Sequence, residues 1–463
     1  MNERDLFDAI TQTPDEMVEE ARHANLKKRT THWRAWVAIA ACAAVVATAV
    51  FTLSPWLPGS IISGTAAIQP LVKVQYPQGY DMEDYDARSQ IYDQNPVDKS
   101  FLTAVNDFSY QTAATLLAQS KGNQNYSPLS LYYALAVAAT GANGDTAAQF
   151  YKLLGVAGSN TLATQCSHLY RLLYTDNNIG QLKMANSVWC NRETTPKTAF
   201  AQTAAEQFYA SMYTADFSQN STAKAMGQWI ADNTGGLLAP DIELQRDQLL
   251  ALYNTVYFCD EWTNDFSKDN TKADTFHTAE GKEVTFDFMN AVQSTAFVRG
   301  DGFVRARLAL KNGGYMEFVL PDEGISPREL IATPERAATV WSGGTEQMGE
   351  VRWKLPKLEI ASTLHLAKTL QALGLTNAFG ESADFSRMVD GTTYISEVQQ
   401  GTRIRLDEKG VEAAAYTEIL YAGSAAPSPN PPDMILDRPF LYGLYTAEDT
   451  PLFLGICDDP TAS

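Results

Sequence analysis

The chain has 463 residues, of which 45% are hydrophobic and 19% charged, a composition typical of folded globular proteins with a large core. Its formal net charge of −19 argues against nucleic-acid binding, because nothing offsets the repulsion from phosphate groups. The sequence contains no G-x-S-x-G, H-E-x-x-H, Walker or G-x-G-x-x-G motif. We therefore expect no catalytic residues, no metal site and no cofactor, and a protein that is not an enzyme.

The N-terminal region contains one long uncharged stretch. Residues 35–53 (AWVAIAACAAVVATAVFTL) are long enough to cross a bilayer as a helix. Five basic residues and no acidic residue occur from Arg22 to Arg34, so the positive-inside rule places residues 1–34 in the cytoplasm. We expect an uncleaved transmembrane signal anchor and a single-pass cell-membrane protein whose remaining chain is extracellular. The alternatives are a buried Ala-rich core helix and a lipoprotein-like processing site before Cys42.

The chain after this stretch divides into a linker and one domain. Residues 54–94 are rich in Pro, Gly, Ser and Asp without periodicity and are expected to form an extracellular linker. Residues 95–463 are patterned as one large domain. Within it, Ser127 followed by proline predicts a helix start, and residues 249–258 (LLALYNTVYF) predict a strand buried on both faces. The polar Asn254 inside that strand needs hydrogen-bond partners.

The C-terminal end of the domain carries two further strand-like runs, residues 440–445 and 452–457, separated by a polar turn. Runs of helices and runs of strands that do not alternate regularly predict an α+β fold.

Five cysteines occur, and no two of them form a CxxC motif. One, Cys42, lies in the uncharged stretch. A disulfide-stabilised ectodomain normally has more cysteines, so we expect the hydrophobic core to stabilise this domain, with the pairing of the other four left open. These four are Cys166, Cys190, Cys259 and Cys457.

Residues 408–421 (EKGVEAAAYTEILY) have two sets of alternating side chains. Their alanines alone suggest a short helix, but a period of two separates a small or apolar face from a face with two carboxylates, as in a strand with one buried side. A proline-rich stretch typical of an exposed loop follows, so the segment is suited to a loop-insertion switch. The apolar face comprises Val411, Ala413, Ala415, Thr417, Ile419 and Tyr421, and the other face comprises Glu412, Ala414, Tyr416, Glu418 and Leu420.

Residues 407–415 (DEKGVEAAA) resemble the hinge of the serpin family (E-x-G-T-E-A-A-A), with Val411 in place of the usual threonine. Other segments are similar to serpin motifs in the same order: residues 125–130 (NYSPLS), 141–146 (GANGDT), 252–258 (LYNTVYF), 318–322 (FVLPD), 355–358 (LPKL), 373–375 (LGL) and 438–440 (RPF). The chain thus resembles a serpin over roughly residues 95–463, and we expect a membrane-anchored member from a bacterium. The resemblance implies a serpin fold, with a mixed large central sheet, smaller sheets, surrounding helices and an exposed reactive loop.

The resemblance also implies two groups of site residues. The hinge would comprise Glu408, Gly410, Val411, Glu412, Ala413, Ala414 and Ala415. The region where the central sheet opens would comprise Ser127, Ser130, Asn254, Gln400 and Trp262. Serpins usually have a histidine where this chain has Gln400. An amide both donates and accepts hydrogen bonds, so it can replace that histidine in the cluster.

As a function, the resemblance implies a suicide-type inhibitor whose partner is a target serine or cysteine protease. Counting from the hinge places the cleaved bond between Ser424 and Ala425, whereas counting back from Phe440 places it nearer Ser428. The small, uncharged residues around Ser424 favour the first position and an elastase-like or subtilisin-like serine protease. The alternatives are a non-inhibitory serpin that acts as a surface binding or structural protein, and a surface enzyme. The other expected partner is the membrane, through the N-terminal helix.

Overall fold

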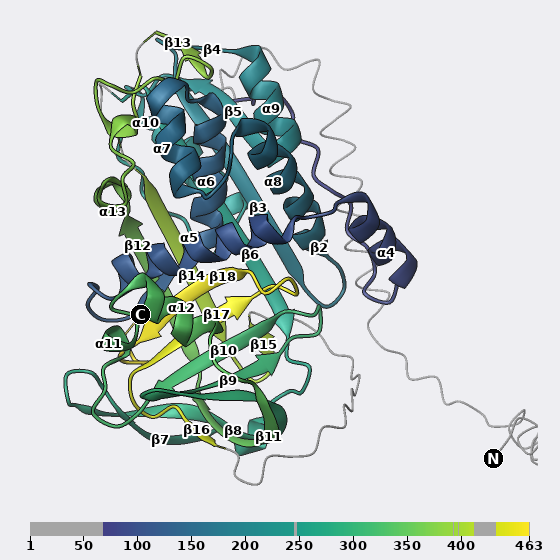
Figure 1. Ribbon diagram of the computed structural model, residues 1–463, viewed down its shortest axis with the longest axis vertical. Helices are drawn as coiled ribbons and strands as arrows, with labels where there is room; N and C mark the ends of the chain where they lie inside the picture. The colour runs from purple at the N-terminus through teal and green to yellow at the C-terminus, as the bar shows by residue number, and fades with distance from the viewer. Residues whose placement is uncertain (1–67, 245–247, 392, 397, 412–431, 463) are drawn as a thin grey trace, which may run out of the picture. The chain divides into compact units, whose positions relative to one another are not determined.

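The computed structural model describes residues 68–244, 248–391, 393–396, 398–411 and 432–462 (Figure 1). Helices and strands occur in runs in this part of the chain, as expected for an α+β fold. The helices are α4 (Tyr85–Gln94), α5 (Lys99–Leu117), α6 (Pro128–Gly141), α7 (Gly144–Leu153), α8 (Ser159–Leu173), α9 (Thr198–Phe208), α10 (Asn220–Asp232), α11 (Pro327–Leu330), α12 (Pro334–Ser342) and α13 (Ala367–Ala372), with short 3₁₀ helices η1 (Lys268–Asn270) and η2 (Asn377–Phe379).

A sheet of seven strands, called the central sheet below, carries the candidate site. Its order is β12-β14-β15-β6-β3-β2, and β5 pairs with β3. The β3–β5 pair is parallel and the β3–β6 pair is antiparallel, so the predicted mixed central sheet is confirmed. Its strands are β2 (Thr175–Asp176), β3 (Gln181–Asn191), β5 (Ala210–Ala215), β6 (Leu250–Glu261), β12 (Leu358–His365), β14 (Gln399–Leu406) and β15 (Gly410–Val411).

A second sheet of nine strands has the order β1-β18-β17-β10-β9-β8-β11-β16, and β7 pairs with β8. The two C-terminal strands expected from the sequence are present as β17 and β18. The strands are β1 (Gln124–Tyr126), β7 (Lys272–His277), β8 (Glu283–Gly300), β9 (Phe303–Ala309), β10 (Tyr315–Pro321), β11 (Gln347–Pro356), β16 (Asp433–Ile435), β17 (Phe440–Tyr445) and β18 (Pro451–Cys457). A small pair joins β4 (Thr195–Pro196) to β13 (Val389–Asp390).

Helix α6 begins as the sequence predicts. The Ser127 hydroxyl accepts a hydrogen bond from the Ser130 N–H, and Pro128 occupies the first turn, where its missing N–H costs nothing. Side chains all round this helix are buried, as is typical of a helix enclosed by the core. It lies among α5, α7, α8 and α9 on one face of β3 and β6 (Figure 1).

The other face of the central sheet has a smaller core of its own. Met226 and Trp229 of α10 pack with Ala251 and Tyr253 of β6 and with Trp189 of β3. Helices α6 and α10 therefore lie on opposite faces of the sheet, because successive side chains of a strand point to opposite sides.

The predicted location in the cell membrane is wrong for the part of the chain that the structure describes. No helix in this part is both long enough and apolar enough to cross a membrane. The most apolar one, α6, has 14 residues, whereas a span needs about 20. The longer α5 has 19 residues but carries charged and polar side chains along its length. Residues 35–53 themselves lie outside the described residues, and a membrane location is not retained.

Part of the predicted linker is ordered against the domain. Residues 85–94 form α4, with Asp84 as its N-cap. Upstream of α4, the Leu71 N–H donates to the Met212 carbonyl at 2.7 Å, and Tyr76 stacks on Tyr209 with ring centroids 6.2 Å apart. Residues 68–94 thus extend the folded unit towards the N-terminus.

Candidate functional site

The central sheet has an opening between β14 and β6. No ladder pair joins these two strands among the described residues. The two-residue strand β15 links them at one end only, where Val411 pairs antiparallel with Leu406 of β14 and with Asp260 of β6. Since β15 is antiparallel to both, β14 and β6 run in the same direction. A further strand antiparallel to both could therefore fit between them.

The sequence predicts a fully buried strand at residues 249–258, and the structure differs there. Much of the interior of β6 is only half-buried. The reason is the opening, because beyond β15 none of the described strands pairs with this edge of β6.

Gly410 fixes the start of the hinge against β6. A Cβ atom at this position would lie 2.1 Å from the Asp260 carbonyl oxygen, which only a glycine avoids. The next residue, Val411, is 2% exposed. The hinge therefore enters the sheet at Gly410 with its first β-branched side chain already in the core.

Glu408 holds the hinge through charged and neutral hydrogen bonds. Its carboxylate lies 3.1 and 3.2 Å from Lys357 Nζ and accepts from Thr271 Oγ1 at 2.9 Å, and the residue is 6% exposed. Burial alone would raise the pKa of Glu408, but its own backbone N–H, Thr271 and Lys357 together lower the pKa below its usual value. Glu408 is therefore ionised at neutral pH.

Trp262 covers the point where the chain turns into the hinge. Its indole N–H donates to the Asp407 carbonyl at 2.9 Å, and its backbone N–H donates to the Lys409 carbonyl at 2.8 Å. Its ring packs edge-on against Phe266, with centroids 6.2 Å apart. Trp262 therefore lies beside the hinge, at one end of the opening.

Asn254, in the middle of β6, has the partners that its position requires. The Ser130 hydroxyl donates to Asn254 Oδ1, and Asn254 Nδ2 donates to Asn186 Oδ1. Asn186 Nδ2 in turn donates to the Phe208 carbonyl at 2.9 Å. This chain of hydrogen bonds ties β6 to the N-terminus of α6 on one side and to β3 on the other.

Gln400 makes a separate connection from β14 to α6. Its Oε1 accepts from the Ser127 N–H at 2.9 Å, and its Nε2 donates to the Ser127 carbonyl at 2.8 Å. In the described part of the chain no hydrogen bond joins Gln400 to Asn254. The two strands that border the opening are thus each attached to the first turn of α6, through separate hydrogen bonds.

The structure brings the described site residues together in two places. Glu408, Gly410 and Val411 lie with Trp262 at one end of the opening, and the serines of α6 lie with Asn254 and Gln400 farther along it. The remaining predicted residues lie outside the described residues. These are Glu412, Ala413, Ala414, Ala415, Ser424 and Ala425.

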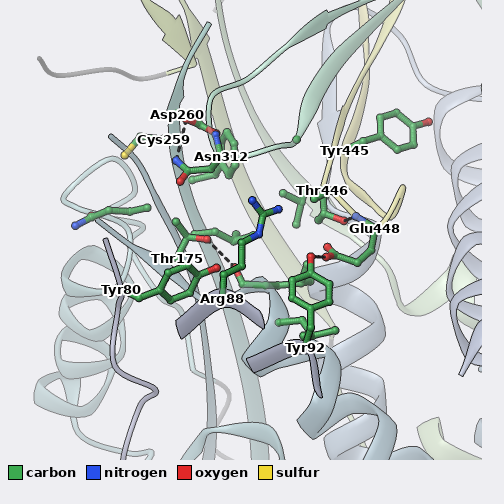
Figure 2. A pocket seen from close by; sticks show the side chains of 18 residues that line it. Tyr80, Arg88, Tyr92, Thr175, Cys259, Asp260, Asn312, Tyr445, Thr446 and Glu448 are labelled. Carbon is green, nitrogen blue, oxygen red and sulfur yellow. Dashed lines mark hydrogen bonds between the residues drawn. The ribbon is translucent and has the colours of Figure 1, made fainter. Parts of the chain in front are cut away.

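A cavity lies beside the hinge end of β6 (Figure 2). Asp260 and Asn312 face the cavity on one side. On another side the Tyr92 hydroxyl donates to the Glu448 carboxylate, and Arg88 lies between the two sides. The described lining contains no histidine and no serine, and its one thiol is that of Cys259. The cavity lies between α4, the β17–β18 turn and β6, one of the strands that border the opening.

Asp260 is a buried carboxyl whose ionisation is linked to folding. It is 1% exposed and accepts from the Asn312 N–H at 3.1 Å, the Asn312 amide at 3.0 Å and the Glu261 N–H at 2.8 Å. Burial raises its pKa to about 7, which these hydrogen bonds only partly oppose.

We expect Asp260→Asn to change how stability depends on pH. A carboxyl whose pKa is about 7 when folded and about 4 when unfolded favours the folded state while protonated. That contribution is lost as the pH rises from about 4 through about 7. The midpoint of urea unfolding of the variant, relative to wild type, should therefore be higher at pH 8 than at pH 5. A constant difference between the two pH values would contradict this role of Asp260.

The four described cysteines form no disulfide with one another, and three of them are buried. Burial raises the pKa of Cys190 to about 12 and that of Cys457 well above its usual value, so neither is a reactive thiolate. Within residues 68–462, the described positions contain no group of three or more His, Cys, Asp or Glu side chains that could hold a metal ion.

Comparisons with known proteins agree with this geometry. A family model described as Serpin (serine protease inhibitor) matches residues 103–460. Serpin-Z1A of Triticum aestivum is 29% identical over 360 residues, which cover 72% of this chain and 90% of the relative. The crystal structure of the thermophilic serpin tengpin in the native state has a TM-score of 0.72 and 26% identity, and the match covers 85% of this chain and 100% of tengpin. Serpin48 of the insect Tenebrio molitor has a TM-score of 0.69 and 27% identity, covering 78% of this chain and 98% of that structure.

The curated relative named above comes from wheat, and Serpin-Z4 of Hordeum vulgare is likewise 29% identical. The predicted bacterial source is therefore not supported.

Proposed function

The chain belongs to the serpin family, and we propose that it is a suicide-type protease inhibitor and not an enzyme. Its target attacks the reactive loop, and the freed end of the loop inserts between β14 and β6 before the acyl-enzyme is hydrolysed. The single observation that carries this proposal is the opening, which, in the part of the chain that the structure describes, is bridged only by Gly410 and Val411. We assign this activity to residues 95–463.

The register of β15 defines how the loop would enter. Val411 pairs with Leu406 and Asp260, so an antiparallel continuation pairs residue 413 with Ile404 and Phe258. Continuing further, residue 417 meets Gln400 and Asn254. The even-numbered residues of β14 from Gln400 to Leu406 are buried. The loop face that would be buried with them is the small, apolar face that begins at Val411.

Insertion is favourable because the loop forms backbone hydrogen bonds with both β14 and β6 and because its apolar face is buried. Part of the space that the inserted loop would fill is already present. A cavity under the opening is lined by Leu135, Leu252 and Asn254, together with Gln400. Before cleavage the loop is tethered at both ends, so the uninserted fold persists for kinetic reasons.

The target class follows from the residues around the cleaved bond. Ser424, Ala425 and their neighbours are small and uncharged, which suits a serine protease with a shallow primary pocket, of the elastase or subtilisin type. A cysteine protease is the second candidate partner. A non-inhibitory surface binding or structural role is the alternative function, and it is disfavoured by the alanine-rich hinge, because bulky or charged hinge residues would obstruct insertion.

We expect cleavage between Ser424 and Ala425. After reaction with an elastase-like protease, mass spectrometry of the released C-terminal peptide should find a fragment that begins at Ala425 or within two residues of it. A fragment that begins after Lys409, or beyond Pro432, would show that the loop is cut elsewhere.

A further inference from the structure

A pocket lies on the outer face of the opening, the face opposite α6. Its floor is formed by Tyr253 and Thr255 of β6 and by Gln399 and Gly401 of β14, and its volume is about 210 Å³. Its roof is apolar and comes from α10 and the segment after it, with Ile230, Leu237, Leu238, Pro240 and Ile242. We call this set of residues the outer pocket.

Two features of the pocket floor are unusual for a sheet whose strands are all paired. The Thr255 hydroxyl is buried and has no hydrogen-bond partner among the described residues, and the residue is 3% exposed. A buried hydroxyl without a partner is unfavourable, because nothing replaces the water that it loses on folding. Across the opening, Gly401 has no side chain, and a Cβ atom there would meet only Leu238, at 3.6 Å. The floor therefore has an unpaired donor on one strand and an empty position on the other.

The register of β15 brings one bulky loop residue to this place. Val411 pairs with Asp260 and with Leu406, and five residues farther along an antiparallel strand, residue 416 meets Thr255 on one side and Gly401 on the other. Residue 416 is a tyrosine. It belongs to the loop face that points away from α6 and therefore towards the outer pocket.

We propose that the outer pocket is the receptor for the Tyr416 side chain when the cleaved loop inserts; this rests on the proposed function. The ring covers Gly401, as aromatic side chains do across from strand glycines, and packs under Leu238. The phenol of Tyr416 lies on the same face of the sheet as the Thr255 hydroxyl. Tyr416 thereby stabilises the inserted state and leaves the uncleaved state unchanged.

The roof of the outer pocket is attached to the side of the opening that Tyr416 must reach. Arg403 Nη1 donates to the Leu237 carbonyl at 3.2 Å, which fastens the roof to β14. The Thr234 hydroxyl accepts from the Leu238 N–H and donates to the Ile230 carbonyl, which holds the turn after α10. The pocket is thus built before the loop arrives.

The test compares unfolding temperatures of intact and loop-cleaved full-length protein. Cleaved wild type should unfold at a higher temperature than intact wild type. Tyr416→Ala should lower the unfolding temperature of the cleaved form by several degrees without changing that of the intact form, and Tyr416→Phe should retain most of the gain. Glu418→Ala, on the same loop face, is the matched control and should change little.

A second pair of variants tests the pocket without altering the loop. Leu238→Ala should lower the unfolding temperature of the cleaved form when residue 416 is tyrosine and much less when it is alanine. If cleaved wild type gains no stability, loop insertion itself is wrong. If it gains stability and Tyr416→Ala gains as much, insertion stands and the role of the outer pocket is overturned.

Discussion

Ala413→Arg is expected to convert the protein from an inhibitor into a substrate of its target protease. In the register set by β15, residue 413 enters the sheet between Ile404 and Phe258, and Ile404 is buried. An arginine there would place a guanidinium without a partner in the core, at a cost of several kcal/mol against the inserted state. We expect the loop of the variant still to be cut, because the cost arises on insertion.

The measurement is a denaturing gel after incubation with an elastase-like protease. Wild type should give a covalent complex that survives SDS, and Ala413→Arg should give cleaved protein and active protease. Ala414→Arg is the matched control, because residue 414 lies on the opposite loop face, beside the half-buried Arg403 and Tyr257, and its long side chain can reach water without entering the core under the sheet. Equal loss of complex in both variants, or no complex from wild type, would remove the case for insertion.

Local patterns predicted the elements whose cause is local. The serine and proline at the start of α6 specify its first turn, and the apolar run at residues 249–258 corresponds to most of β6. The two C-terminal runs correspond to β17 and β18. In each case the deciding interactions lie within a few residues or follow from one hydrophobic periodicity.

Helix α4 escaped prediction because it has no apolar periodicity. None of its side chains is buried, and its sequence, YDARSQIYDQ, is polar on every face. Its order comes from contacts outside itself, such as the hydrogen bond from Tyr92 to Glu448 across 356 positions. The local sequence of the helix does not indicate a partner so far away along the chain.

The candidate site was predictable where the hinge motif names residues and not where distant chain segments supply partners. Glu408 follows from the motif, but its partners Lys357 and Thr271 lie 51 and 137 positions away. Asn186 meets Asn254 only because β3 and β6 pair in that register. Gln400 likewise binds the backbone of Ser127, which lies 273 positions away.

Gln400→Ala is expected to shorten the time for which the intact protein stays inhibitory. Gln400 is 4% exposed, and its removal leaves the buried Ser127 N–H without a partner, whereas the Ser127 carbonyl keeps the hydrogen bond from the Leu131 N–H at 3.2 Å. A buried N–H that loses its partner costs roughly 1–3 kcal/mol. The link also fastens β14 to α6, so its loss should ease the separation of β14 from β6 that insertion of an uncleaved loop requires.

Since about 1.4 kcal/mol corresponds to a tenfold change in rate, we expect the half-life of inhibitory activity at elevated temperature to fall at least about tenfold in Gln400→Ala. The measurement is residual complex formation with an elastase-like protease after timed incubation of the uncleaved protein. Arg405→Gln is the matched control, because residue 405 is exposed on β14, points to the face opposite Gln400 and does not line the outer pocket. Gln400→His restores one donor and one acceptor and should recover part of the half-life. Equal half-lives for Gln400→Ala and Arg405→Gln would show that the attachment of β14 to α6 does not control the opening.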